Sequence, residues 1–259
     1  MIQFPPGLEI AKDLSSSIWV QETLRDRPER PFRVRDLTTP RFEAYARILH
    51  GPRRPSDRQI STGTWSARAA EIGVRLGPET RWDDLDGPGS DTWVLWPGEL
   101  IGPEVETLAH TLAEHTSSAD ACSFGFWSGW GHLDATGVLY MAGGPAARRL
   151  ATWRARAAGR RRNRRNRKQL RRLPTFPTHG GSRSYLLFRG SVAEAGSFWP
   201  ATGQCPTIWW PDDRAWLVHT HIEATSTYLG GSRALIDQVV GEQVLESFEV
   251  QPDAQVAWE

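Results

Sequence analysis

Apolar residues recur along parts of the chain with the short period that is typical of β-strands. Over residues 42–49 every second side chain is apolar, and this period of two predicts a strand. Residues 122–127 and 185–188 are short, mainly apolar runs, and the second is expected to be buried on both faces of a sheet. A hairpin is predicted over residues 206–223, because the Pro-Asp-Asp turn at 211–213 separates two apolar segments.

Four other segments carry the apolar spacing of helices. A short helix is expected over residues 15–24, where three serines precede the first apolar side chains. Residues 64–73 begin with a threonine that can cap a helix and end with a glycine. Residues 103–112 form an apolar stripe behind a proline that suits the first helical position, and residues 232–241 begin with a capping serine.

These elements predict the fold class. Because the one clear pair of neighbouring strands is a hairpin, the sheet is expected to be antiparallel or mixed, with helices packed on it. We therefore expect an α+β fold. The 259 residues are enough to bury a sizeable core and are expected to form a single domain, 1–259. Residues 135–183 interrupt the pattern and are expected to form a basic insertion or long excursion within that domain.

The chain shows no sign of a membrane or secretory segment. No stretch approaches the roughly 20 consecutive apolar residues that a membrane-spanning helix needs. Residues 1–6 lack the basic region and apolar run of a signal peptide. The two cysteines, Cys122 and Cys205, are too few for the disulfide framework of a small secreted domain. We therefore expect a cytoplasmic protein without membrane association.

Motifs of the common catalytic and cofactor-binding loops are absent from the sequence. The chain contains no GxSxG elbow, no GxxxxGK[ST] phosphate loop and no GxGxxG dinucleotide fingerprint. It also lacks the HExxH motif of zinc enzymes. No cofactor is therefore expected, and nucleophilic catalysis has no positive support.

Tryptophan is abundant, with thirteen residues in the chain. Tryptophan packs well in cores and also anchors binding surfaces, and the sequence leaves both roles open. On the strand predicted at 42–49, Tyr45 and Arg47 share the polar face, where the Arg47 guanidinium could hold an anion; a solvated face or a structural ion pair is the alternative. The candidate ligand or partner surface comprises Trp127, Trp130, Trp209, Trp210, Tyr45 and Arg47.

A second candidate site lies on the second strand of the hairpin. Side chains alternate along a strand, so His219, His221 and Glu223 share one face. Two imidazoles and a carboxylate are weak candidates for a metal half-site, and they are also the best-placed polar groups for an enzyme of unknown class. The alternative is that this face meets solvent while the opposite face, with Trp216 and Val218, packs on the core.

Charge is distributed very unevenly. Residues 148–172, the arginine-rich segment, hold 13 of the 31 basic residues and no acid, which leaves 18 bases against 30 acids elsewhere, a net charge of about −12. Dense arginine attracts phosphates by charge and by release of counterions. An arm that folds against its own acidic body is the alternative. The candidate residues for binding nucleic acid or another polyanion are Arg160, Arg161, Arg162, Arg164, Arg165, Arg167, Lys168, Arg171 and Arg172.

Several segments resemble a family of uncharacterised actinobacterial proteins. The resemblance is carried chiefly by FEAYARILH at 42–50, WWPDDRAW at 209–216 and TYLGGS at 227–232, and it spans most of the chain apart from the arginine-rich segment. Position 221 is more typically acidic in the family pattern, so His221 departs from it. The resemblance brings with it no assigned activity, cofactor or catalytic residue, so it implies only a shared fold.

The sequence thus leads to three hypotheses on function. The aromatic content and the absence of catalytic motifs favour a non-catalytic binding or regulatory protein, with another protein as a possible partner at the tryptophan-rich surface. The second hypothesis is an enzyme with its site around His219, His221 and Glu223. The third is polyanion binding through the arginine-rich segment, which could coexist with either of the others.

Overall fold

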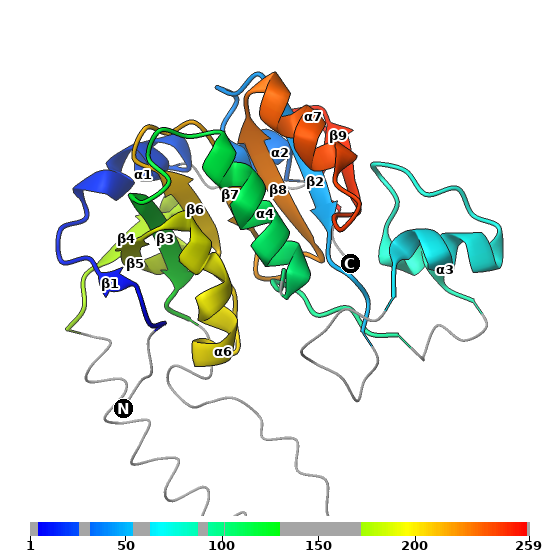
Figure 1. Ribbon diagram of the computed structural model, residues 1–259, viewed down its shortest axis with the longest axis horizontal. Coiled ribbons are helices and arrows are strands. Elements are labelled where there is room, and N and C mark those ends of the chain that lie inside the picture. Colours follow the sequence, from blue (N-terminus) through cyan, green and yellow to red (C-terminus); the bar gives the residue numbers. More distant parts are fainter. Residues whose placement is uncertain are drawn as a thin grey trace, which may run out of the picture.

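The computed structural model describes residues 5–25, 32–53, 63–87, 93–100, 102–129 and 172–257. Within these residues one nine-stranded sheet runs through the molecule, and every strand pairing in it is antiparallel (Figure 1). The spatial order is β1-β5-β3-β6-β7-β8-β2-β9, and β4 also pairs with β5. The strands are β1 (Glu9–Ile10), β2 (Ala44–Leu49), β3 (Cys122–Trp127), β4 (Thr175–Thr178), β5 (Arg183–Gly190), β6 (Ile208–Pro211), β7 (Leu217–Thr220), β8 (Ser226–Gly231) and β9 (Ser247–Val250).

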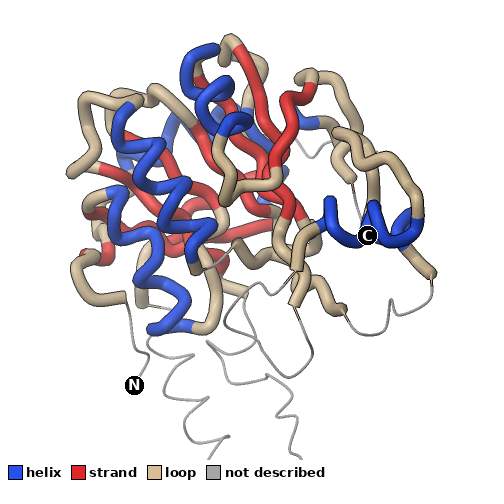
Figure 2. The backbone as a smooth tube through the Cα atoms, turned by 45° about the vertical axis from the view of Figure 1, so that its right-hand side comes forward, coloured by secondary structure: helices blue, strands red, loops and turns tan. Residues whose placement is uncertain are grey.

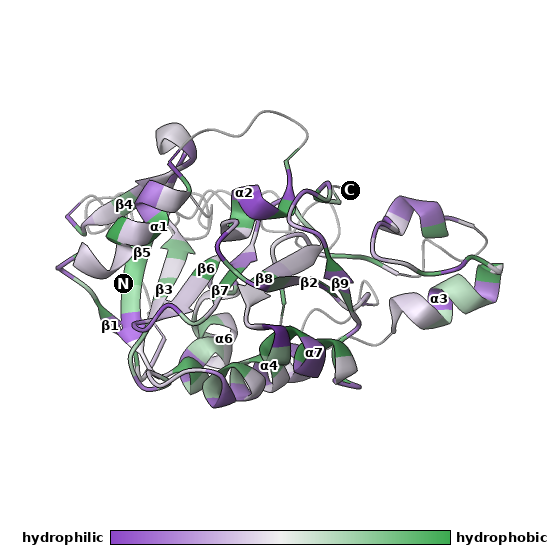
Figure 3. Cartoon of the chain, turned by 90° about the horizontal axis from the view of Figure 1, so that it is seen from above, coloured by the Kyte–Doolittle hydropathy of each residue, from purple (hydrophilic) through white to green (hydrophobic). Residues whose placement is uncertain are grey.

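Helices cover both faces of the sheet, and the predicted α+β class is therefore confirmed. Figure 3 shows α4, α6 and α7 on one face, with α1 and α2 on the other. The α-helices are α1 (Ile18–Thr23), α2 (Val34–Thr38), α3 (Trp65–Ile72), α4 (Pro103–Glu114), α6 (Phe198–Thr202) and α7 (Arg233–Gly241). Short 3-10 helices are η1 (Ser15–Ser17), η2 (Trp82–Leu85), η4 (His179–Gly181) and η5 (Val192–Ser197). Within the described residues, none of the helices combines the length and the apolar character needed to cross a bilayer.

Local signals place the helix ends where the sequence predicts them. The Thr64 hydroxyl accepts a hydrogen bond of 3.1 Å from the Ala67 amide at the start of α3. The helix stops at Gly73, whose φ of 71° lies in the left-handed region that glycine adopts without strain. Ser232 caps α7 in the same way as Thr64 caps α3, with a bond of 3.2 Å from the Leu235 amide.

The α3 unit, residues 63–87, lies beside the sheet rather than over it (Figures 1 and 2). The Glu246 carboxylate accepts hydrogen bonds from the backbone amides of Trp65 (2.6 Å) and Ser66 (2.8 Å), at the N-terminal end of α3 where a negative charge is favoured. Apolar side chains of the unit pack on Leu49 of β2 and against Phe248 of β9.

The last part of the predicted excursion belongs to the sheet. Strand β4, helix η4 and the first residue of β5 fall within residues 135–183, so the end of the predicted excursion, at 183, is placed too late. Residues 130–171 lie outside the described part of the chain. Strand β3 ends at Trp127, opposite Tyr185, and β4 begins at Thr175, opposite Leu186. The segment that connects β3 to β4 therefore leaves and rejoins the sheet at neighbouring positions of β5, Tyr185 and Leu186.

Candidate functional site

The expected surface of tryptophans is wrong for Trp209 and Trp210, which are only 2% and 1% exposed. These neighbours on β6 point to opposite faces of the sheet, and each face is covered by helices. Trp209 packs in the cluster that includes α4 and α7, and Trp210 packs in the cluster that includes α1. Trp127 is half-buried, with the Arg183 guanidinium 5.6 Å from its ring centroid. Trp130 lies outside the described residues.

Tyr45 and Arg47 are also buried rather than exposed, because β2 lies between β8 and β9 and both of its faces are covered. The Tyr45 hydroxyl donates to the carbonyl of Thr39 at 2.8 Å. Arg47 Nη1 donates to the carbonyls of Pro78 (2.9 Å) and Thr80 (2.7 Å). These side chains hold loops to the sheet and do not form an open anion site.

The face of β7 that carries His219 is covered by α2, so the expectation that this face meets solvent is wrong. His219 is fully buried, and His221 is 5% exposed. The Nδ1 atom of His219 donates to the Leu37 carbonyl at 2.8 Å, because a carbonyl can only accept. Among the residues that the structure describes, none forms a hydrogen bond with the Nε2 atom of His219. The pKa of His219 lies well below its usual value. Burial is the largest cause, and the nearby His179 and His221 lower the pKa further.

A third imidazole, which sequence reasoning missed, completes a histidine cluster of His179, His219 and His221. The ring centroid of His219 lies 6.0 Å from that of His179 and 6.4 Å from that of His221. Phe32 closes the group, with its ring centroid 6.3 Å from His179 and 6.0 Å from His221. The only signal for His179 in the sequence is the Thr-His-Gly-Gly turn at 178–181. The backbone there is left-handed, with φ of 50° at His179.

Glu223 does not join this cluster. Its side chain is 61% exposed and lies 3.9 Å from Arg183 Nη2, on the outside of the sheet. His221 Nδ1 accepts a bond of 3.2 Å from the Glu223 backbone amide, so this nitrogen is already occupied. In the described part of the chain, no group of three or more His, Cys, Asp or Glu side chains is placed to hold a metal ion.

The two hydrogen bonds of the His179 ring fix which of its nitrogens carries the proton. The Asp36 carbonyl accepts from His179 Nε2 at 3.1 Å, so Nε2 carries the proton. Burial lowers the pKa of His179, and the neutral ring then accepts at Nδ1 from the Thr178 hydroxyl, 3.0 Å away. The proton of Thr178 is therefore committed to His179. Burial raises the pKa of Tyr185, which lies on the neighbouring strand β5, to about 12.

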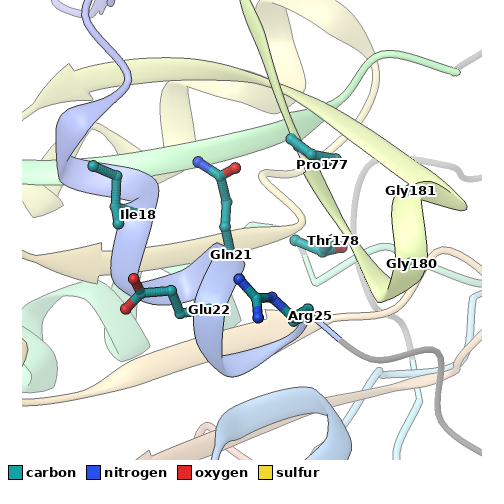
Figure 4. Close-up of a pocket in the computed structure, with 8 residues that line it drawn as sticks. All are labelled: Ile18, Gln21, Glu22, Arg25, Pro177, Thr178, Gly180 and Gly181. Carbon is teal, nitrogen blue, oxygen red and sulfur yellow. The ribbon is translucent and has the colours of Figure 1, made fainter.

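Thr178 also lines an open cavity of about 440 Å³ between α1 and η4, called here the α1–η4 cavity (Figure 4). Its wall on the β4 side is fixed by two backbone bonds of 2.6 Å, from the amide of His179 to the carbonyl of Leu24 and from that of Gly180 to Arg25. The lining residues are Ile18, Gln21, Glu22, Arg25, Pro177, Thr178, Gly180 and Gly181.

A second cavity, of about 370 Å³, lies where the α3 unit meets the start of α4. The cavity is lined by the carboxylates of Glu104 and Glu246, among others, but Glu246 is already bonded to the start of α3. Arg53 and Glu99 are two further buried charges, which form an ion pair of 2.9 Å. The charges in this region thus serve to join the α3 unit and the following loop to the body.

Neither cysteine has the character of a nucleophile. Burial raises the pKa of the Cys122 thiol to about 12 and that of Cys205 well above its usual value. Because the thiolate is the reactive form, almost none is available at neutral pH.

Of the candidate polyanion-binding residues, Arg172 is described and is exposed, and the others lie outside the described residues. No family model, no curated protein and no solved structure matches the chain. The resemblance to uncharacterised actinobacterial proteins therefore stays a prediction.

Proposed function

We propose that the protein is a non-catalytic binding protein that holds polyanions such as nucleic acid through its arginine-rich segment. The observation that carries this proposal is the charge distribution: 13 basic residues without an acid in residues 148–172, on a remainder with 18 bases and 30 acids. Each phosphate that an arginine neutralises releases counterions, which drives binding without regard to sequence.

The aromatic groups support binding by charge rather than by base stacking. Recognition of single-stranded bases needs exposed aromatic side chains. Near the segment the candidates are Trp153, which lies outside the described residues, and Phe176, which is buried under α1 at 0% exposure. The affinity is therefore expected to be similar for duplexes of different sequence.

Burial supports a binding role over a catalytic one for the body of the protein. The imidazoles of His179 and His219 are held neutral beneath α2, and the exposed Glu223 carboxylate is directed elsewhere. Both thiols are kept protonated. A general base would need to reach a proton on its substrate, and these groups are closed off from one.

A deletion tests the proposal. Because β3 and β4 flank β5, the strand ends Trp127 and Thr175 lie about 10 Å apart. A linker of about six Gly and Ser residues reaches about 20 Å when extended, which leaves slack for the residues between these strand ends and the linker. Replacing residues 130–171 with this linker should leave the circular dichroism spectrum and the unfolding midpoint unchanged. Fluorescence anisotropy with a duplex of random sequence should show binding by the intact chain at low salt and none by the deletion variant.

A matched pair of variants separates charge from fold. Changing Arg160, Arg161, Arg162, Arg164, Arg165 and Arg167 to lysine keeps the charge and should keep most of the binding. Changing them to glutamine removes six of the 13 positive charges and should weaken the binding strongly. The log of the affinity should fall against the log of salt concentration with a slope of about −0.9 per neutralised phosphate. Failure of the deletion variant to fold, or absence of binding by the intact chain at low salt, would contradict the proposal.

A further inference from the structure

We propose that the α1–η4 cavity binds a small zwitterion with a primary ammonium group, such as an amino acid or a short peptide. This inference goes beyond polyanion binding and uses no residue of the arginine-rich segment. It rests on which hydrogen-bonding atoms the fold leaves free on the cavity wall.

At Thr178 the cavity offers an acceptor. The Thr178 hydroxyl donates its one proton to His179 Nδ1, because His179 Nε2 is held as a donor by the Asp36 carbonyl. A hydroxyl oxygen has two lone pairs, and these remain after its proton is given to His179. What Thr178 can still do for a ligand is to accept a hydrogen bond.

Gln21 presents a second acceptor to the same cavity. The Ser17 hydroxyl donates to the Leu14 carbonyl at 2.7 Å, so Ser17 Oγ must accept the bond of 2.8 Å from Gln21 Nε2. This fixes the amide with its nitrogen toward Ser17. Figure 4 shows the result, with the Gln21 oxygen on the side of Pro177 and the nitrogen on the side of Ile18.

Charges of both signs line the cavity. Glu22 and Arg25 are exposed, and within the described part of the chain neither forms an ion pair. The Thr178 hydroxyl, the Gln21 amide oxygen and the Glu22 carboxylate are all acceptors. Together they favour a ligand that is rich in N–H donors and carries positive charge. The Arg25 guanidinium favours a carboxylate on the same ligand. A primary amine with a carboxylate meets both requirements.

The size and the walls of the cavity fit such a ligand. Its volume of about 440 Å³ lies within the range of small-molecule sites. Ile18, 51% exposed, and Pro177 add apolar surface for the carbon skeleton. The charged groups are exposed, so water weakens their attraction, and we expect a dissociation constant on the order of 1 mM.

Nuclear magnetic resonance of the full chain tests the proposal, with glycylglycine as the probe. The backbone amide signals of Gly180 and Gly181 should shift as glycylglycine is added at neutral pH. N-acetylglycylglycine, which lacks the ammonium, should cause no shift at the same concentrations. Glycylglycinamide, which lacks the carboxylate, should bind several-fold more weakly than glycylglycine.

Variants of exposed or half-buried side chains link the shifts to the cavity. Gln21→Leu and Arg25→Ala should each weaken glycylglycine binding at least threefold. Arg75→Ala, which removes an exposed arginine in the α3 unit, is the matched control and should leave binding unchanged. Equal shifts with the acetylated probe, or shifts that persist in both cavity variants, would overturn the proposal, as would the absence of any shift up to 20 mM probe, about twentyfold above the expected dissociation constant.

Discussion

His219 Nδ1 donates a hydrogen bond of 2.8 Å to the carbonyl oxygen of Leu37, and this bond ties the central strand β7 to the C-terminal end of α2. His179 makes the corresponding bond to the neighbouring Asp36 carbonyl, at 3.1 Å. The last carbonyls of a helix have no partner within it and must find one elsewhere. Two imidazoles supply that partner here, and they fasten a helix of five residues to the sheet.

The bond from His219 should be measurable as stability. His219→Phe keeps the volume of the side chain but leaves the buried Leu37 carbonyl without a donor, which costs about 1–3 kcal/mol. Removal of the Nε2 atom, which bonds to none of the described residues, offsets part of this, so we expect a loss near the lower limit. Urea denaturation measures it. His110→Phe is the control, since that side chain is 81% exposed, and an equal loss in both variants would contradict the interpretation.

Stability should fall in mildly acidic solution. Burial lowers the pKa of His179 and His219, and that of His50 to about 3, below the 6.5 of an unfolded chain. The unfolded state therefore binds protons first, so stability is complete above pH 6.5 and decreases as the pH falls below it. Three such groups account for up to about 4 kcal/mol between pH 7.5 and 5.5.

Chemical denaturation at a series of pH values checks this slope. Carboxyl groups with ordinary or lowered pKa values stay ionised above pH 5.5 and do not contribute there. The His219→Phe variant should lose less stability than the parent over the same interval. A flat profile between pH 7.5 and 5.5 would show that the histidines are protonated in the folded state.

Both thiols should be inert in the folded protein. Cys122 and Cys205 are buried, at 0% and 4% exposure, and their pKa values are raised by that burial. We expect 5,5′-dithiobis(2-nitrobenzoate) at pH 8 to modify neither cysteine within minutes and both at once after addition of guanidinium chloride. Rapid reaction of one thiol in the native protein would instead indicate an exposed, activated cysteine.

Two glycines allow a matched test of backbone conformation. A methyl group added at Gly181 or at Gly241 meets no atom within 4 Å, so neither substitution causes a clash. Gly181 has φ of 79°, where alanine costs about 1–2 kcal/mol. Gly241 is the last residue of α7, where alanine favours the helix by up to about 1 kcal/mol. Thermal unfolding should therefore move in opposite directions in the two variants, and equal shifts would contradict the left-handed turn at η4.

Much of the fold could be predicted because its signals are local. A capping hydroxyl and a terminal glycine define α3, and the run at 122–127 matches β3 at both ends. The same reasoning gave exposed faces to Arg47 and His219. It treated a polar side chain on a strand as solvated, whereas both of these bond to carbonyls that are distant in the sequence.

The site was not predictable for a related reason. The α1–η4 cavity is formed by residues 18–25 and 177–181, which are separated by about 150 positions and brought together by pairing of β4 with β5. His179 lies in a segment whose composition suggested an excursion. Only the fold shows that the imidazole reaches the end of α2.

The position of the α3 unit affects how the protein meets other copies of itself. Strand β9 ends the sheet on one side, and a strand in that position offers unpaired amides and carbonyls to any neighbouring chain. The α3 unit lies beside this strand and packs against Phe248, held there by the Glu246 carboxylate. One carboxylate at the end of a helix thus holds a separate unit beside an open sheet edge, where that unit limits the room for a second sheet to approach.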